Sequence, residues 1–379
     1  MNKKEIGIYI HIPFCKQKCY YCDFVSYVNQ KEKEEKYIES VLIQIDSYNF
    51  ANYNVNTIYI GGGTPSFIDV KLIKNIVTKL KEKINLKNVK EFTIEINPGT
   101  VDKNKLEQYR SLGINRLSIG LQSTKNKILK QIGRIHTFED FTQTYIYARE
   151  VGFKNINVDL MIGLPNQLML DLKESVEQII NINPEHISVY SLIIEKGTKL
   201  EKLINGGLVK LPNEELERNM YWYVKNTLEK NKYNHYEISN FAKEGYESKH
   251  NLNCWNQKEY IGFGVAAHSY IEDKRFSNIC NLDKYIENIR SGYIEQNIII
   301  EEEQNLEEKQ KEYMLLGLRK IDGIQISKFK QKFMKNPIML YKKELEKLVK
   351  GELVEIDGNE IKLTKKGLDF ANIVWEEFV

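Results

Sequence analysis

The feature that most constrains the fold is a regular alternation between short β-branched segments and longer amphipathic ones. Residues 70–84 place apolar side chains three and four positions apart, as in a helix with one buried face. Parallel strands joined by helices follow, because consecutive parallel strands need a crossover. The predicted strands span residues 6–12, 56–60, 90–96, 115–121, 156–162 and 186–192.

Six such units are too few for a closed eight-stranded barrel, so the sequence predicts an α/β fold with a partial (β/α)6 barrel. The loops that follow the strands would border one mouth of this barrel. Chemically distinctive residues cluster at these positions: Cys15, Cys19 and Cys22 after the first strand, Gly62, Gly63 and Thr64 after the second, Glu95 at the end of the third, Gln122 after the fourth and Asp159 at the fifth.

The amino-acid composition changes beyond residue 300, where the segment EEEQNLEEKQKEYMLLGLRK predicts a Glu- and Lys-rich helix. Two more helical stretches follow, and Asp357-Gly358 marks a hairpin turn between two short strands before a last helix. This order predicts a winged-helix-like α+β domain. We therefore expect a barrel core over 1–235, an extension over 236–300 and a C-terminal domain over 301–379.

Charge and hydropathy exclude several classes of protein. The 55 Lys and Arg residues and 52 Asp and Glu residues nearly balance, which speaks against a partner made of nucleic acid. The winged-helix-like part is then a packing module, since fold alone does not give function. The sequence has no secretory signal and no membrane span, so we expect a cytoplasmic protein in a reducing compartment.

The cysteine spacing C-x3-C-x2-C gathers three soft ligands in one short loop, as iron-sulfur clusters and zinc require. A cubane cluster held by three thiolates leaves one iron open to a small molecule. A structural zinc site would need a fourth protein ligand, for which His11 and Cys254 are the candidates. The remaining loop residues favour the cluster, and the zinc site stays as the alternative.

The segment IYIHIPFCKQKCYYCDF resembles the cluster loop of the radical S-adenosylmethionine superfamily. The similarity continues through GGGTPS, EINPGT, RLSIGLQS, GRIH, DLMIGLP, YEISNFAKEGY and HNLNCW. Within the superfamily the chain is most similar to the HemW family, heme chaperones related to oxygen-independent coproporphyrinogen III oxidase.

The resemblance implies a 4Fe-4S cluster on the three cysteines and an exchangeable S-adenosylmethionine. Arg134 would pair with the methionyl carboxylate, because guanidinium and carboxylate groups match as a bidentate pair. The glycines would let the backbone approach the amino end, and the carboxylates would accept from the ammonium or ribose hydroxyls. Expected cofactor contacts are Tyr9, Tyr21, Gly62, Gly63, Thr64, Glu95, Gln122, Arg134 and Asp159.

Two functions compete within this family. The oxidase extends the motif to C-x3-C-x2-C-x-C, whereas this chain has Phe24 at the last position. The oxidase also has an extra segment ahead of its first strand, and this chain starts only a few residues before that strand. These differences favour a heme chaperone without coproporphyrinogen oxidase activity. The oxidase is the alternative, and whether radical chemistry occurs stays open.

The segment HNLNCW resembles the H-N-x-x-Y-W motif that has been linked to heme binding in the chaperones. His250 is therefore the expected axial heme ligand, and Trp255 could pack on the porphyrin. Cys254 replaces the usual tyrosine, either as a packing change or as a thiolate near the heme. His268 is a second candidate ligand, and Cys280 is expected to be a small buried hydrophobe.

The expected partner is a heme-accepting protein such as a respiratory cytochrome. The family resemblance also allows a peripheral contact with a membrane through this acceptor and a homodimer promoted by the cluster.

Overall fold

The computed structural model describes residues 3–379, in which twelve strands form one mixed sheet. Its centre consists of parallel strands in chain order, and each predicted strand overlaps one of them. These strands are β1 (Lys4–Ile12), β2 (Tyr53–Gly62), β3 (Glu91–Ile96), β4 (Arg116–Gln122), β5 (Ile156–Ile162) and β6 (His186–Ser191). The predicted α/β fold with a six-stranded parallel core is therefore confirmed.

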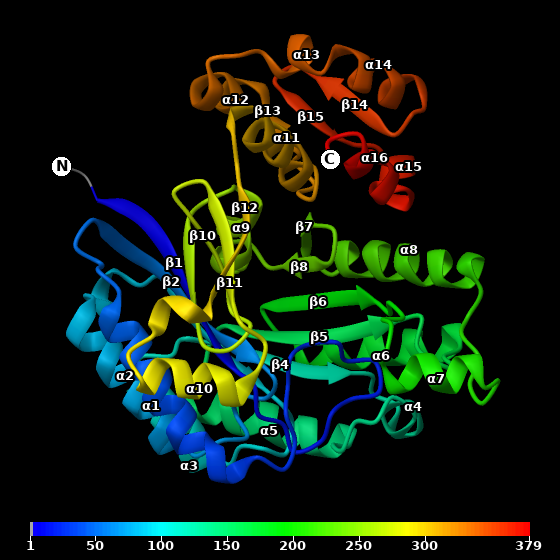
Figure 1. Cartoon of the computed structure of the whole chain (residues 1–379). Helices are drawn as coiled ribbons and strands as arrows, with labels where there is room; N and C mark the ends of the chain where they lie inside the picture. The colour runs from blue at the N-terminus through cyan, green and yellow to red at the C-terminus, as the bar shows by residue number, and fades with distance from the viewer. Residues whose placement is uncertain (1–2) are drawn as a thin grey trace.

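Helices cover one side of this core. In α2 (Val70–Lys83), which matches the predicted helix, the buried residues recur three and four positions apart. Asp69 caps this helix by accepting a hydrogen bond from the backbone N–H of Lys71 at 2.8 Å. Figure 1 shows this helix group on the side of the sheet away from the C-terminus. Besides α2 it includes α1 (Glu34–Ser47), α3 (Lys103–Ser111) and α5 (Phe138–Val151).

Additional strands extend the sheet at both edges, and these the sequence did not predict. Next to β1, a short parallel strand is followed by three antiparallel ones, and an antiparallel hairpin extends the sheet beyond β6. On the β1 side lie β9 (Tyr260–Phe263), β10 (His268–Ile271), β11 (Lys274–Asn278) and β12 (Ile298–Glu303), and on the β6 side β7 (Asn234–Glu237) and β8 (Asn240–Ala242).

One secondary-structure prediction is wrong. Residues 301–303 were expected to begin a Glu-rich helix, but they end β12, and the helix α11 starts only at Leu306. The acidic side chains tolerate the strand because β12 is the exposed edge of the sheet, paired with β11 alone. Asn305 then caps α11, together with Glu308, in a reciprocal capping box.

The C-terminal residues build a second hydrophobic core around Met314, Phe329, Leu348 and Ile361. Helices precede a hairpin whose strands, β14 (Val354–Asp357) and β15 (Glu360–Leu363), pair in antiparallel register as predicted. The other elements are α11 (Leu306–Gly317), β13 (Ile324–Gln325), α12 (Ile326–Phe333), α13 (Pro337–Leu340), α14 (Lys342–Lys350), α15 (Lys365–Asp369) and α16 (Ala371–Glu376).

Arg319 joins the two cores. Its guanidinium carbon lies 4.5 Å from the ring centroid of Trp255 and 4.6 Å from that of Trp375. Its carbonyl accepts a hydrogen bond from the backbone N–H of Ile238 at 3.1 Å. Trp255 ends α9 (Lys249–Trp255) in the main body, whereas Trp375 lies in α16, so one cation is held between aromatic rings of both parts.

Among residues 3–379, no helix combines the length and the apolar character that a membrane crossing requires.

Candidate functional site

The three motif cysteines lie in the loop that follows β1. A backbone hydrogen bond from Cys15 to the carbonyl of Tyr27, 2.9 Å long, closes the base of this loop. Cys15, Cys19 and Cys22 all line one cavity of about 370 Å³, called the cysteine cavity below. Burial raises the pKa of the Cys15 thiol and raises that of Cys22 to about 11, so a metal must displace thiol protons when it binds.

Neither candidate for a fourth protein ligand faces these thiols. The His11 ring uses both nitrogens, since Nδ1 shares a hydrogen bond with the Tyr9 hydroxyl at 3.0 Å and Nε2 with the Val25 carbonyl at 2.8 Å. Cys254 lines a different cavity. In the described part of the chain, no three His, Cys, Asp or Glu side chains converge on a position for a single ion. Three thiols that each bind their own iron, with one iron left open, fit this arrangement better than a zinc knuckle.

Most of the predicted cofactor contacts line the cysteine cavity. They come from the loop after β1 and from β2 to β5, and Arg134 joins them from the turn after α4 (Asn126–Gln131). The residues brought together in this way are Tyr21, Gly62, Gly63, Thr64, Glu95, Gln122, Arg134 and Asp159. Tyr9 is not among them, because it lines the neighbouring cavity.

The backbone after β2 is packed too closely for side chains. A Cβ on Gly63 would lie 2.9 Å from Cys15 Sγ, and Gly62 has a φ of 116°, in the left-handed region that favours glycine. The N–H groups of Gly62, Gly63 and Thr64 donate to Glu95, Ile12 and Phe14. These three N–H groups are therefore already paired within the protein.

Two partly buried carboxyl groups, Glu95 and Asp159, line the cysteine cavity. Glu95 accepts hydrogen bonds from the Tyr59 hydroxyl at 2.9 Å and the Gly62 N–H at 3.0 Å. Burial, helped by the nearby Asp159, raises the pKa of Glu95 to about 7. Burial also raises the pKa of Asp159, which accepts from the Asn157 amide at 2.7 Å. A bound cation would lower both pKa values, so this wall suits an ammonium group.

Arg134 is less free than a carboxylate fork requires. Its Nη1 donates to Asn97 Oδ1 at 3.0 Å and its Nη2 to the Gly120 carbonyl at 2.9 Å. Its buried Nε has no partner within residues 3–379. A buried donor without an acceptor is costly, so this nitrogen is the group left for an anionic ligand.

The sequence did not single out several residues of this cavity. Asn97 lies in the EINPGT segment, which was noted as a whole, and Ser118 and Tyr190 lie on predicted strands. Side chains along β2 alternate between the two faces of the sheet, so Tyr59 lies on the same face as Thr57. This alternation could have suggested Tyr59.

A second cavity, of about 500 Å³, lies beside the first and is called the His250 cavity below. His250 and Cys254 line it from one face of α9, as expected for residues four apart on a helix. Phe24 and Tyr59 line both cavities and separate them. The full lining comprises Tyr9, His11, Asp23, Phe24, Val25, Tyr59, His250, Asn251, Cys254, Tyr260, Ala266, His268 and Cys280.

The His250 ring is buried but keeps one nitrogen free. Nδ1 shares a hydrogen bond of 3.0 Å with Thr57 Oγ1, and Nε2 has no partner among the described residues. The ring centroid lies 5.2 Å from that of Tyr59. Burial lowers the pKa of His250 to about 4, so the ring is neutral at pH 7 and can offer a lone pair to a metal.

Glu91 holds the start of the helix that carries His250. Its carboxylate accepts hydrogen bonds from the backbone N–H groups of Lys249 at 2.8 Å and His250 at 3.2 Å. Ser248 caps the same helix by accepting from the Asn251 N–H at 3.4 Å. A negative charge here stabilises the helix through its N-terminal N–H groups.

The other predicted residues of this region have different outcomes. Burial raises the pKa of the Cys254 thiol to about 11, which favours the packing role over a thiolate. His268 is exposed, and its Nδ1 lies 3.3 Å from Glu301 Oε2. The expectation of a buried Cys280 is wrong, since this cysteine is exposed in the loop between β11 and α10 (Leu282–Arg290).

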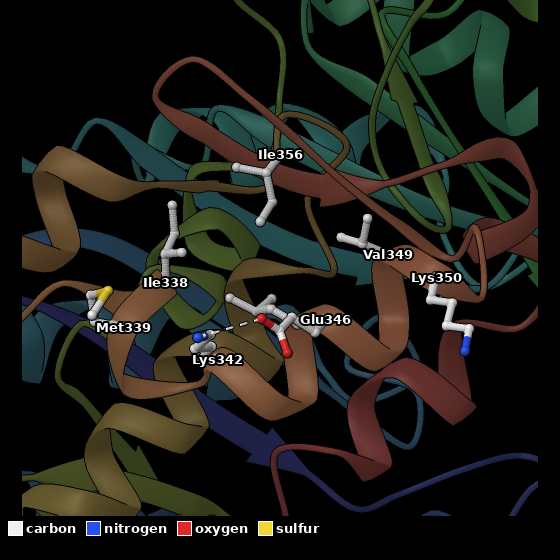
Figure 2. Close-up of a pocket in the computed structure, with 8 residues that line it drawn as sticks. Ile338, Met339, Lys342, Glu346, Val349, Lys350 and Ile356 are labelled. Atoms are coloured by element: carbon white, nitrogen blue, oxygen red, sulfur yellow. Dashed lines mark ion pairs between the residues drawn. The ribbon is translucent and has the colours of Figure 1, made fainter.

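A third hollow, of about 400 Å³, lies in the C-terminal part (Figure 2). Its lining is aliphatic apart from three charged side chains, of which Lys342 and Glu346 form an ion pair of 3.8 Å. Its lining contains no thiol or imidazole, and its one sulfur is the Met339 thioether.

Comparison with known proteins defines the class first. The Radical SAM superfamily matches residues 9–179, and the HemN C-terminal domain matches residues 304–370. The crystal structure of coproporphyrinogen III oxidase (HemN) from Escherichia coli superposes with a TM-score of 0.87 at 22% identity, covering 100% of this chain and 91% of that one. The chain thus has a radical SAM fold.

The particular family follows from closer relatives. The heme chaperones HemW of Lactococcus lactis and Bacillus subtilis are each 36% identical, over 379 and 375 residues, and the alignments cover 98% of each relative. HemW of Escherichia coli is 36% identical over 271 residues, 70% of both chains. The chain belongs to the HemW family.

Proposed function

We propose that this protein is a heme chaperone. It binds one heme in the His250 cavity and transfers it to an acceptor hemoprotein. The observation that carries the proposal is the neutral His250 ring, oriented by Thr57 and presenting a free Nε2 to a cavity that adjoins the three cysteines. A hydrogen bond on one nitrogen fixes the tautomer that leaves the other nitrogen able to bind iron.

The cysteine cavity would hold the resident cofactors. Cys15, Cys19 and Cys22 would bind a 4Fe-4S cluster, and Glu95, Asp159 and the Arg134 Nε would bind S-adenosylmethionine beside it. When bound, such a cluster supplies one-electron reduction of the sulfonium. The protein's own contribution is to hold the three thiols in one cavity and to bind the ammonium with carboxyl groups.

Coproporphyrinogen III oxidation is the second candidate, because the chain shares the fold of that oxidase over its whole length. Phe24 speaks against it. This side chain occupies the position of the oxidase's fourth cysteine and lies in the wall between the two cavities. We infer that the chaperone function, rather than decarboxylation, suits a site built in this way.

Several details of the proposal extend beyond the site. A respiratory cytochrome would be the acceptor, and its location would bring the chaperone to a membrane surface from the cytoplasm. A homodimer promoted by the cluster belongs to the same proposal, as does the division into parts at residues 235 and 300.

Hemin titration of the anaerobically reconstituted protein tests the function. One heme per chain is expected, and His250→Ala should weaken binding at least tenfold and shift the Soret band. The matched control is His235→Ala, which removes a buried histidine that lines neither cavity. Unchanged binding and spectrum in His250→Ala would remove this residue from the site. Conversion of coproporphyrinogen III to protoporphyrinogen IX, with reductant and S-adenosylmethionine, would restore the oxidase.

A further inference from the structure

Tyr59 belongs to the walls of both cavities. Its hydroxyl donates a hydrogen bond to Glu95 Oε1 at 2.9 Å, on the side of the cysteine cavity. Its ring lies against the imidazole of His250, with centroids 5.2 Å apart and an angle of 32° between the planes. One rigid side chain therefore contacts a predicted ligand of each site.

The Glu95 carboxylate is shared between the protein and any group that enters the cysteine cavity. One oxygen accepts from Tyr59, and the other accepts from the Gly62 N–H at 3.0 Å. Both donors are neutral. A cationic ligand forms a stronger hydrogen bond with a carboxylate than a phenol does, so an arriving ammonium competes with Tyr59 for Glu95.

If Tyr59 loses its hydrogen bond to Glu95 and moves, the packing around its ring passes this movement to His250. On one side the Tyr9 ring stacks on it, with centroids 6.3 Å apart, and the Tyr9 hydroxyl is itself tied to His11. Thr57, which holds His250 Nδ1, lies two residues earlier on β2 and therefore on the same face as Tyr59. His250 is thus held by two side chains of one strand, and a shift of either reorients its ring.

We propose that Tyr59 is a positioning residue that couples the two cavities, so that S-adenosylmethionine bound against Glu95 changes the affinity of the His250 cavity for heme. This inference rests on the proposed function. The coupling is reciprocal, since a ligand that changes the affinity for heme must have its own affinity changed by heme by the same factor.

The experiment measures the dissociation constant of hemin with and without saturating S-adenosylmethionine, in the reconstituted full-length protein. We expect a change of about fivefold or more in the parent, the lower end of typical allosteric coupling. Tyr59→Phe keeps the ring but removes the bond to Glu95, and it should bring the ratio of the two constants close to one. The matched control is Tyr233→Phe, which loses a buried hydrogen bond to the Pro184 carbonyl. Neither residue lines either cavity, so this variant should keep the parental ratio.

The same samples provide a second readout. In the Tyr233→Phe control, heme should change the affinity for S-adenosylmethionine by the same factor as in the parent. In Tyr59→Phe, heme should leave this affinity unchanged. A residue with only a structural role would not produce this difference. If Tyr59→Phe does not fold, Glu95→Gln replaces it, at concentrations of S-adenosylmethionine that saturate this variant. The ratio of its two dissociation constants for hemin should then be smaller than in the parent. A parental ratio of one, or a ratio that Tyr59→Phe leaves unchanged, would overturn the coupling. Loss of heme binding altogether in the parent would instead overturn the proposed function.

Discussion

The carboxylate of Glu91 accepts a hydrogen bond from the backbone N–H of His250, 159 residues later in the chain, at 3.2 Å. Glu91 opens β3, whereas His250 lies in the first turn of α9, so a strand of the parallel core fixes the start of the helix that carries the proposed heme ligand. The contact therefore connects β3 and α9 at the residue that we propose as the heme ligand.

Removing the charge of Glu91 should loosen this helix. We expect Glu91→Gln to lower the free energy of unfolding by about 1–3 kcal/mol, because buried N–H groups lose a charged acceptor, and to weaken heme binding. Urea unfolding and hemin titration measure the two effects. Glu308→Gln is the control, since Glu308 caps the exposed start of α11 and its substitution should cost about 0.5 kcal/mol. Equal costs for both variants would argue against a special role of Glu91.

Heme binding should depend weakly on pH in the acid range. Burial lowers the pKa of His250 to about 4, so protons compete with iron only near that pH. An ordinary histidine, with a pKa of about 6.5, would lose affinity progressively below pH 6. The dissociation constant of hemin should therefore stay level between pH 7.5 and about 5.5, a range set by these pKa values. A tenfold loss between these limits would contradict His250 as the ligand.

Glu95 should make the protein without S-adenosylmethionine less stable as pH rises. Its pKa is about 7 in the folded state, against 4.5 in the unfolded chain, so the folded state binds more protons between these values. The stability that this carboxyl contributes is present below pH 4.5 and is lost as pH rises through 7. The loss amounts to about 3 kcal/mol, at 1.36 kcal/mol per pH unit. Urea unfolding measures the free energy of unfolding at pH 5 and at pH 8. The difference between these two values should be smaller in Glu95→Gln than in the parent, and an equal difference in both proteins would contradict the prediction.

Arg319 should tie the C-terminal part to α9. Arg319→Ala removes two cation–π contacts and should destabilise the protein by about 1–3 kcal/mol. Limited proteolysis should then cut more rapidly between the two hydrophobic cores. Arg110→Ala is the control, because Arg110 is exposed and lies over the ring of Phe153 at 5.8 Å, a contact within the main hydrophobic core. Unchanged cleavage in Arg319→Ala would show that other contacts hold the two parts together.

Gating of heme release by the cluster is a separate expectation. Cys19→Ala removes one of the three proposed iron ligands, so reduction or S-adenosylmethionine should no longer change the rate at which heme passes to an apo-cytochrome. Stopped-flow measurement of the Soret band follows this rate in the parent and the variant. Equal rates and equal responses in both proteins would refute the gating.

The sequence predicted local features of the fold and the site, but not contacts between distant segments. Continuous apolar runs such as that of β1 identify buried parallel strands because both faces are covered, and the cysteine spacing identifies a metal loop. The contact of Glu91 with α9 depends on how β3 and that helix pack, which no local pattern encodes. Glu301 to Glu303 form a strand although glutamate favours helices, because pairing with β11 outweighs the local propensity.

Transfer of heme from the loaded, oxygen-protected protein to an apo-cytochrome tests the central claim most directly. The account predicts that the parent, loaded with one heme per chain, converts the acceptor to its holo form, whereas His250→Ala does not retain heme to deliver. Three results would contradict the account: a parent that holds no heme, a parent that never releases heme to the acceptor, or a His250→Ala variant that holds heme as well as the parent.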